Sequence, residues 1–223
     1  MFATLNEDGS YALTGAGYTL LVVILLAVFL LGVFIFGRNR RKSSARQMAF
    51  SAMAIALAMV TSLIKFIHMP MGGSVTLFSM LFICLVGWFY GLGSGLTAAF
   101  AYGLLQLIID PYILSIPQML TDYVFAFTAL GLSGVFSKSK YGLLKGYILG
   151  VAGRYLFAVL SGAIFFGTYA SDYGFTSPVV YSLAYNGAYI GLEAALTIVV
   201  ISIPPVRKAL VRIKQTATGM DTE

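Results

Sequence analysis

Asp122 is the only acidic side chain in the apolar stretch PYILSIPQMLTDYVFAF, which covers residues 111–127. A carboxylate at helix depth in a membrane costs roughly 2.5 to 3.5 kcal/mol, so such a residue is a functional candidate by default. In its ionised form it accepts charge-assisted hydrogen bonds, which are about twice as strong as neutral ones. Asp122 therefore predicts recognition of a cation or of an amidine-like ring edge.

Covalent and metal chemistry find little support in the sequence. His68 is the only histidine and Cys84 the only cysteine, which excludes a histidine-rich metal site and an internal disulfide. No HExxH, CxxC, GxSxG or glycine-rich P-loop motif occurs, so the chain does not hydrolyse ATP through a Walker-type loop. An intramembrane enzyme would need a nucleophile with its base, or a metal set, and the sequence supplies neither. We expect a chain that is not an enzyme and has no cofactor, with a structural role for Cys84.

The elements that must position Asp122 are membrane helices. The chain has 223 residues, of which 59% are hydrophobic and only 10% charged, and its mean hydropathy is +0.90. Apolar runs without polar alternation favour spanning helices over a membrane β-barrel. The expected fold class is therefore an all-α integral membrane protein, and the expected spans are 18–36, 47–67, 76–90, 96–109, 116–136, 146–167 and 179–203.

The basic residues set the expected orientation of these spans. They cluster in RNRRKSSAR (38–46), SKSKYGLLK (137–145) and RKALVRIK (207–214), each beside an apolar run. The positive-inside rule places such loops in the cytoplasm, which argues against nucleic acid as the partner of the +6 net charge. We expect a multi-pass plasma-membrane protein with its N-terminus outside and its C-terminus in the cytoplasm.

Other polar and aromatic side chains share the depth of Asp122 in the outer third of the membrane. Counted along the expected helices, they are Tyr112, Phe165, Phe166, Tyr169, Tyr181, Tyr185 and Asn186. A carboxylate, an amide and several rings at one depth predict a concave site for a small, flat molecule that can carry positive charge. Interfacial tyrosines also form aromatic belts without a ligand, and a buried asparagine can simply bond a neighbouring helix. Both alternatives stay open.

Two further features lie on the expected helices. Arg154 and Glu193 come deep inside their spans, and the high cost of unpaired charge predicts that they bridge two helices as an ion pair. Ala52 and Ala56 continue a stripe of small residues with Ala45 and Ala49, and such a stripe lets another helix approach closely. The partner helix could belong to this chain or to another protein.

Several segments also occur in the order found in a known family. They are GGSVTL (72–77), YGLLQLI (102–108), the stretch 111–136, GRYLFAVLSGAIFFGTYA (153–170) and YSLAYNG (181–187). With these segments the chain resembles the substrate-binding S components of energy-coupling factor (ECF) transporters, specifically the thiamine-specific type. The resemblance implies a six-helix core, preceded here by one extra N-terminal transmembrane helix. The implied parts are an N-terminal segment with the extra helix and a basic linker (1–44), a six-helix substrate-binding domain (45–206) and a cytoplasmic tail (207–223).

The resemblance also implies functions for individual residues. The chain would bind thiamine at its outer face and associate with a transmembrane coupling subunit and two ATPases in the lipid bilayer. Ala52 and Ala56 match the small-residue stripe that meets the coupling subunit. The implied substrate-binding residues are Asp122 as the acidic ligand, Tyr123 beside it, Tyr112, Gly162, Phe166, and Tyr181 and Asn186 for the aminopyrimidine.

The chain departs from the family pattern at several pocket positions. Asp122 stands for a longer glutamate, Ala158 for a histidine and Phe166 for a stacking tryptophan. The first outer loop has Met71-Gly72-Gly73 where a tryptophan can stand, and the chain's only tryptophan, Trp88, lies at the inner end of the span 76–90. These departures keep a related ligand open, such as a pyrimidine or thiazole precursor or a pyridoxine-like vitamer. A stand-alone transporter would usually show an internal repeat, and none is evident.

Overall fold

The computed structural model describes residues 3–5, 11–17, 19–20, 23, 27 and 44–219. Most of the helix expected at 18–36 and most of the basic cluster at 38–46 lie outside the described residues, as does the expected outer position of Met1. In the N-terminal segment, strands β1 (Ala3–Leu5) and β2 (Tyr11–Leu13) pair in antiparallel orientation.

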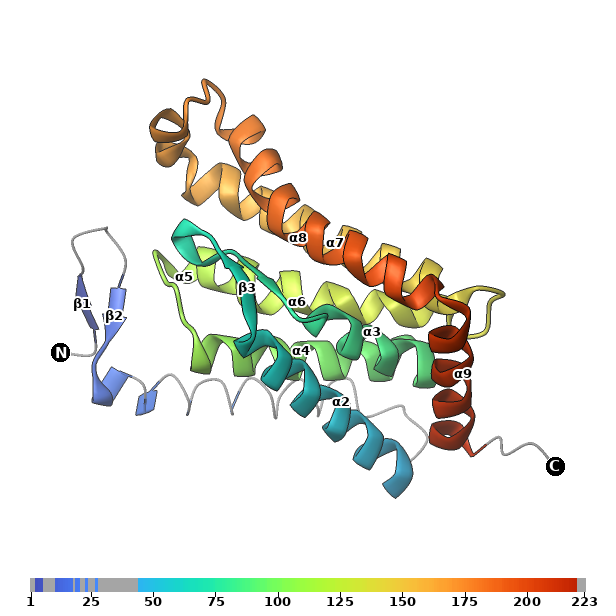
Figure 1. The fold of residues 1–223 in the computed structure, drawn as a ribbon. Helices are drawn as coiled ribbons and strands as arrows, with labels where there is room; N and C mark the ends of the chain where they lie inside the picture. The colour runs from blue at the N-terminus through green and yellow to red at the C-terminus, as the bar shows by residue number, and fades with distance from the viewer. Residues whose placement is uncertain are drawn as a thin grey trace.

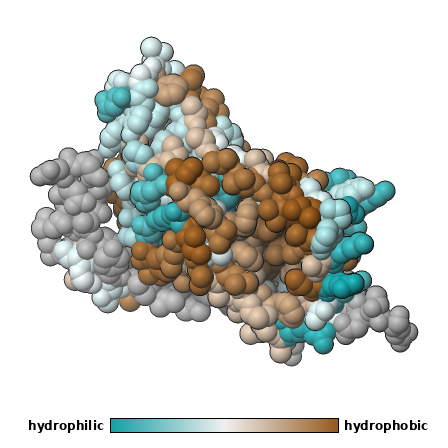
Figure 2. Space-filling view, in the orientation of Figure 1, coloured by the Kyte–Doolittle hydropathy of each residue, from teal (hydrophilic) through white to brown (hydrophobic). Residues whose placement is uncertain are grey.

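The expected all-α membrane architecture is confirmed. Five helical segments of the described chain are long and apolar enough to cross a membrane. They are α2 (Ala45–Leu63), α4 (Leu92–Ile109), the continuous segment Ile116–Phe136, α7 (Gly142–Phe165) and α8 (Pro178–Ser202). A shorter apolar helix, α3 (Ser79–Tyr90), completes the bundle in Figure 1. Figure 2 shows a broad hydrophobic surface with hydrophilic residues gathered toward the two ends, as embedding in a bilayer requires.

The predicted boundaries were wrong at the connection between the expected helices 47–67 and 76–90, where both helices are shorter than predicted. Helix α2 ends at Leu63, and strand β3 (Lys65–His68) pairs antiparallel with β4 (Ser74–Thr76). The turn η1 (Pro70–Gly72) closes this hairpin, with Met71 and Gly72 both in the left-handed region of φ. Backbone pairing between the two segments satisfies their amide groups, so neither segment needs to extend its helix.

The segment that carries Asp122 changes its helical winding along its length. It begins as α5 (Ile116–Met119), where the Ser115 side chain accepts a hydrogen bond from Gln118 N, and Pro117 occupies the first turn. It widens into a π-helical turn, η2 (Leu120–Phe125), then continues as α6 (Ala126–Thr128) and as the tighter η3 (Ala129–Phe136). Wide turns of this kind frequently occur at functional sites, and this one contains Asp122.

The core of the bundle lies where α3, α4, η3 and α7 meet. Ile83, Cys84, Leu130 and Tyr147 are fully buried there, so Cys84 occupies the position of a small apolar side chain. A Cβ added to Gly131 would lie 2.4 Å from the backbone nitrogen of Leu96. Only glycine permits η3 and α4 to approach this closely.

The segment predicted only as a cytoplasmic tail begins with a folded helix, α9 (Pro204–Thr218). The chain turns at Ile203, because two successive prolines cannot donate the hydrogen bonds that would continue α8. Figure 1 shows α9 lying across the end of the bundle. Tyr90 OH donates to Ala217 O at 3.1 Å and Arg46 Nη1 to Thr216 O at 3.4 Å, and these bonds fix α9 to α3 and α2.

Candidate ligand-binding site

A cavity of about 150 Å³ lies at the end of the bundle opposite α9. Its walls come from the β3–β4 hairpin with the adjoining ends of α2 and α3, from α4 and the loop after it, from the η2 turn and α6, and from α7 and α8. The cavity is smaller than the roughly 300 to 1,000 Å³ typical of pockets for drug-sized ligands, which suits a small molecule. All seven predicted binding residues line it: Tyr112, Asp122, Tyr123, Gly162, Phe166, Tyr181 and Asn186. Their binding of a ligand stays a prediction.

The Asp122 carboxylate is held by a neighbouring amide. Gln118 Nε2 donates to Asp122 Oδ2 at 2.7 Å and to Tyr112 O at 3.1 Å, while Gln118 Oε1 accepts from Leu114 N at 2.9 Å. Gln118 is only 1% exposed, so it ties the carboxylate to the loop after α4. Gln118 engages only Oδ2, and the buried Ser161 hydroxyl lies beside the carboxylate, so Oδ1 can accept a bond from a ligand.

Two aromatic side chains form a stacking surface in the cavity. The rings of Tyr112 and Phe166 are 5.9 Å apart at an interplanar angle of 27°. Tyr123 has a different function in the structure, because its OH donates to Asp110 O at 3.0 Å and accepts from Tyr112 N at 2.7 Å. Tyr123 thus fixes the loop that carries Tyr112 as well as lining the cavity.

Asn186 bonds the neighbouring helix, the alternative that the sequence left open. Its Nδ2 donates to Ala158 O at 3.2 Å and to Ser182 O at 3.0 Å, and its Oδ1 accepts from Tyr189 OH at 2.9 Å. The close packing of α7 against α8 needs a glycine at this point of α7, since a Cβ at Gly162 would lie 2.1 Å from Ser182 Oγ. Asn186 and Gly162 therefore join α7 to α8 directly at the wall of the cavity.

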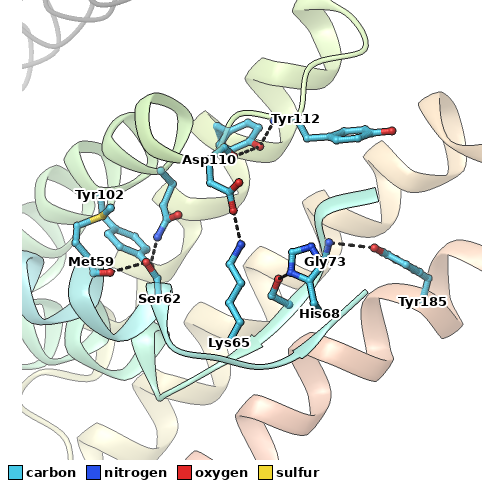
Figure 3. Close-up of polar contacts among 12 residues, drawn as sticks. Met59, Ser62, Lys65, His68, Gly73, Tyr102, Asp110, Tyr112 and Tyr185 are labelled. Carbon is cyan, nitrogen blue, oxygen red and sulfur yellow. Dashed lines mark hydrogen bonds and ion pairs between the residues drawn. The ribbon is translucent and has the colours of Figure 1, made fainter. Parts of the chain in front are cut away.

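Tyrosines of α8 hold the hairpin tip against the bundle. Tyr185 OH donates to Pro70 O and accepts from Gly73 N at 3.0 Å, as Figure 3 shows for the second bond. Tyr181 is 3% exposed, and its ring stacks on Tyr173 at 5.6 Å. Tyr181 is therefore buried beside the cavity and does not face lipid as a belt residue would.

The predicted Arg154–Glu193 ion pair is wrong. Glu193, 3% exposed, accepts from Thr76 N at 2.9 Å, Thr76 Oγ1 at 2.6 Å and Met80 N at 3.2 Å. These donors surround the start of α3, where Phe78 provides no side-chain cap, so the carboxylate of α8 supplies the missing acceptor. Arg154 instead lies over the Phe127 ring, 4.3 Å from its centroid, and its charge borders the cavity.

Sequence reasoning missed several residues of the cavity. Lys65 and Asp110 form an ion pair of 2.5 Å, visible in Figure 3 and the only pair found among the residues the structure describes. Gln118 gave a readable signal, because it precedes Asp122 by four residues, the spacing at which helical side chains meet. Met71 and Gly73 lie in the expected outer loop 68–75, where the chain departs from the family pattern, but the sequence did not predict that a β-hairpin brings them to the cavity.

The alanine stripe on α2 faces away from the described core. Ala45, Ala49, Ala52 and Ala56 are exposed, whereas Ala54 and Ala58 make the buried face of the helix. The stripe therefore does not serve packing within the described bundle. Contact of Ala52 and Ala56 with a coupling subunit stays a prediction.

Comparison with known proteins gives concordant matches. Residues 48–212 match the family model described as thiamine transporter protein (Thia_YuaJ). The thiamine transporter ThiT of Bacillus subtilis strain 168 is 35% identical over 169 residues, which cover 68% of this chain and 85% of that protein. ThiT of Lacticaseibacillus paracasei is 32% identical over 130 residues, covering 51% and 64% of the two chains. A solved structure of ThiT from Listeria monocytogenes shares the fold, with a TM-score of 0.57, 24% identity, and coverage of 71% of this chain and 94% of that one.

Proposed function

The chain belongs to the thiamine transporter protein family, and from this premise we propose that it is the thiamine-binding subunit of an ECF-type uptake transporter. The observation that carries the proposal is the half-satisfied carboxylate of Asp122 in a cavity with a stacked aromatic wall. Thiamine offers a thiazolium cation and an aminopyrimidine, which are the two groups that a carboxylate and aromatic faces recognise.

In the proposed complex, Asp122 Oδ1 accepts a hydrogen bond from the ligand while Gln118 keeps the carboxylate in place. One ring of the ligand lies against the Tyr112–Phe166 surface. Asn186 Oδ1 already accepts from Tyr189 OH, and a carbonyl oxygen has two lone pairs, so it can accept a second bond from the ligand amine. Tyr181 closes the wall beside the hairpin, and Tyr123 and Gly162 maintain its shape.

The proposed orientation puts this cavity outside the cell. Lys138, Lys140, Lys145 and the basic residues of α9 gather at the opposite end of the bundle, which the positive-inside rule assigns to the cytoplasm. In this orientation the protein lies in the plasma membrane and captures substrate on the outer side.

Uptake in this proposal needs partner subunits. The P-loop motif is absent from the sequence, so ATP hydrolysis is assigned to two ATPases joined through a transmembrane coupling subunit. The exposed stripe at Ala52 and Ala56 is the proposed contact with the coupling subunit, because small side chains permit close helix approach in lipid.

Isothermal titration calorimetry of the purified full chain tests the proposal. Thiamine, its mono- and diphosphate, and the separate pyrimidine and thiazole precursors would be titrated under identical conditions. We expect saturable binding with thiamine preferred over either precursor, because only thiamine presents both the cation and the aminopyrimidine. Tighter binding of a precursor or of a pyridoxine-like ring would overturn the assignment to thiamine.

A further inference from the structure

A second cavity, of about 870 Å³, lies at the α9 end of the bundle. It is bounded by the end of α3, the connection before α7 and the turn from α8 into α9. The cavity combines cationic side chains with apolar and aromatic ones, and none of the described residues that line it is acidic. The cations are Lys138, Arg207 and Lys214, and the larger apolar and aromatic side chains are Trp88, Phe89, Tyr90, Tyr141, Leu143, Leu144, Ile201 and Val211.

The cations of this cavity contact aromatic rings rather than carboxylates. Lys214 Nζ lies 4.5 Å from the Trp88 ring centroid and donates to Ser137 O at 2.6 Å. The Arg207 guanidinium lies 4.7 Å from the Tyr141 ring centroid. Among the described residues the only ion pair is at the far end of the bundle, so no carboxylate of those residues neutralises either charge here.

The Lys214 ammonium is partly withdrawn from water. Partial burial lowers the pKa of Lys214 below its ordinary value, because the charged ammonium loses part of its hydration. An anion placed in the cavity would restore that lost solvation. Arg207 and Lys214 are seven residues apart, about two helical turns, so α9 presents them on one face.

The position of the cavity matches the headgroup level of a bilayer. It borders the ends of the spanning segments, and α9 lies across those ends in Figure 1. Helix α9 carries Arg207, Lys208, Arg212 and Lys214, yet on another side, about 120° around the helix from Arg207, it exposes the apolar side chain of Ile213 at 44%. A short helix with basic and apolar faces is typical of segments that lie in the membrane interface.

We propose that this cavity binds one anionic phospholipid. The phosphodiester is held by Arg207 and Lys214, with Lys138 at the rim, and one acyl chain follows the apolar wall of Leu143, Leu144 and Ile201. The mixed lining decides for a lipid over a soluble anion, because a free phosphate would leave that apolar wall exposed to water. The proposal does not depend on which ligand occupies the opposite cavity.

Native mass spectrometry of the detergent-purified full chain tests the proposal. Phosphatidylglycerol would be titrated beside phosphatidylcholine with the same acyl chains. We expect one saturable phosphatidylglycerol molecule and weaker phosphatidylcholine binding. Arg207→Gln and Lys214→Gln should each weaken phosphatidylglycerol binding by about tenfold, the effect of losing one charged hydrogen bond.

Matched variants separate a defined site from general attraction to a basic helix. Arg212→Gln and Lys208→Gln remove the same charge from α9, but neither residue lines the cavity. Both variants should bind phosphatidylglycerol with the affinity of the unaltered chain. Thiamine binding, measured by calorimetry, should be unchanged in all four variants. Equal weakening by Arg212→Gln and Arg207→Gln would overturn the site.

The source of the phosphate is tested by competition. Glycerol 3-phosphate and inorganic phosphate, at the concentration of the lipid, should not displace phosphatidylglycerol, because they lack the acyl chain. Displacement by either would overturn the lipid assignment in favour of a soluble anion. Arg207 is exposed, so its variant should fold normally and decides the outcome even if Lys214→Gln destabilises α9.

Discussion

At the scale of single residues, the candidate site depends on a carboxylate that is positioned but not fully engaged. Gln118 occupies Asp122 Oδ2, and its own burial prevents it from turning away to solvent. By contrast, the buried carboxylate of Glu193 is fully engaged by backbone and hydroxyl donors. The same chemical group therefore has a structural function in α8 and a proposed binding function in the η2 turn, and the difference lies in the surrounding donors.

Removing the charge of Asp122 tests the first of these positions. Asp122→Asn keeps the size of the side chain and should lower thiamine affinity by ~10- to 100-fold, the effect of losing an ion-assisted bond. Calorimetry measures the change, and Asp172→Asn, an exposed acid in η4 (Gly167–Tyr173) outside the cavity, is the control. Unchanged affinity for every ligand tested would leave Asp122 as a bond between α5 and the η2 turn.

Enlarging the aromatic wall tests the stacking surface. Phe166→Trp should strengthen thiamine binding by roughly two- to tenfold, because tryptophan offers a larger π face to a cationic ring. The control is Phe165→Trp, one residue earlier and outside the cavity lining, which should leave affinity unchanged. Weaker binding in Phe166→Trp alone would mean that the space beside Tyr112 is already filled by the ligand.

At the scale of elements, the β3–β4 hairpin and α3 are held by α8. Tyr185 bonds the hairpin tip, while Glu193 bonds Thr76 at the end of β4 and Met80 at the start of α3. One face of α8 thus fixes both ends of the segment that covers the cavity. The uncapped start of α3 would otherwise leave buried amides without acceptors.

Loss of this contact should destabilise the protein. Glu193→Ala leaves several buried donors unsatisfied, at a cost of roughly 1 to 3 kcal/mol, and should lower the thermal midpoint of the ligand-free protein by several degrees. Glu193→Gln keeps one acceptor oxygen and should lower it less. Thermal unfolding in detergent measures both, and equal midpoints for Glu193→Ala and the unaltered chain would show that α3 is capped in another way.

The alanine stripe of α2 yields a second prediction for an element. Replacing Ala52 and Ala56 together with leucine should abolish thiamine uptake in cells while calorimetric binding stays unchanged, because bulk would block close helix approach. The control is the same double change at Ala184 and Ala188, which are also exposed and four residues apart on α8. Loss of binding in the α2 variant would show instead that the stripe supports the bundle.

At the scale of the whole molecule, the two ends of the bundle differ in chemistry. One end holds the smaller cavity with its carboxylate and aromatic rings, and the other holds a larger cavity with cations and apolar walls. Figure 2 shows the hydrophobic surface that separates the hydrophilic ends. This polarity is the basis of the proposed orientation in the membrane.

Cysteine accessibility tests the orientation. Ser171→Cys in η4 should react with a membrane-impermeant maleimide on intact cells, and Ser139→Cys should react only after permeabilisation. Cys84 is fully buried and should give no background. A third variant, Ser10→Cys, should react from outside if the span expected at 18–36 crosses the membrane. Reaction of Ser139→Cys on intact cells would reverse the proposed orientation.

Much of the architecture was readable from the sequence alone. Uninterrupted apolar runs predict membrane helices because backbone amides have no other partners in lipid, and the structure confirms them in the described chain. The free-energy cost of a buried carboxylate likewise singled out Asp122 as a candidate. The sequence segments that occur in the same order as in a known family indicated that family. These inferences depend on amino-acid composition and on the free-energy cost of placing single groups in lipid, and both can be read from the sequence.

Only the tertiary structure decided which partner each polar group takes. The sequence could not show that the chain after Leu63 pairs with Ser74–Thr76 as a strand, because hairpin pairing depends on both segments meeting in space. It predicted a wrong partner for Glu193. The free-energy cost of burying a charge requires a polar partner, but it does not decide between an arginine and the backbone amides at the start of α3. It also treated Arg207 and Lys214 as a basic tail, whereas the turn at Ile203 folds them back against Tyr141 and Trp88. Such contacts join residues far apart in the chain, and their energies depend on three-dimensional distance, which no spacing along the sequence encodes.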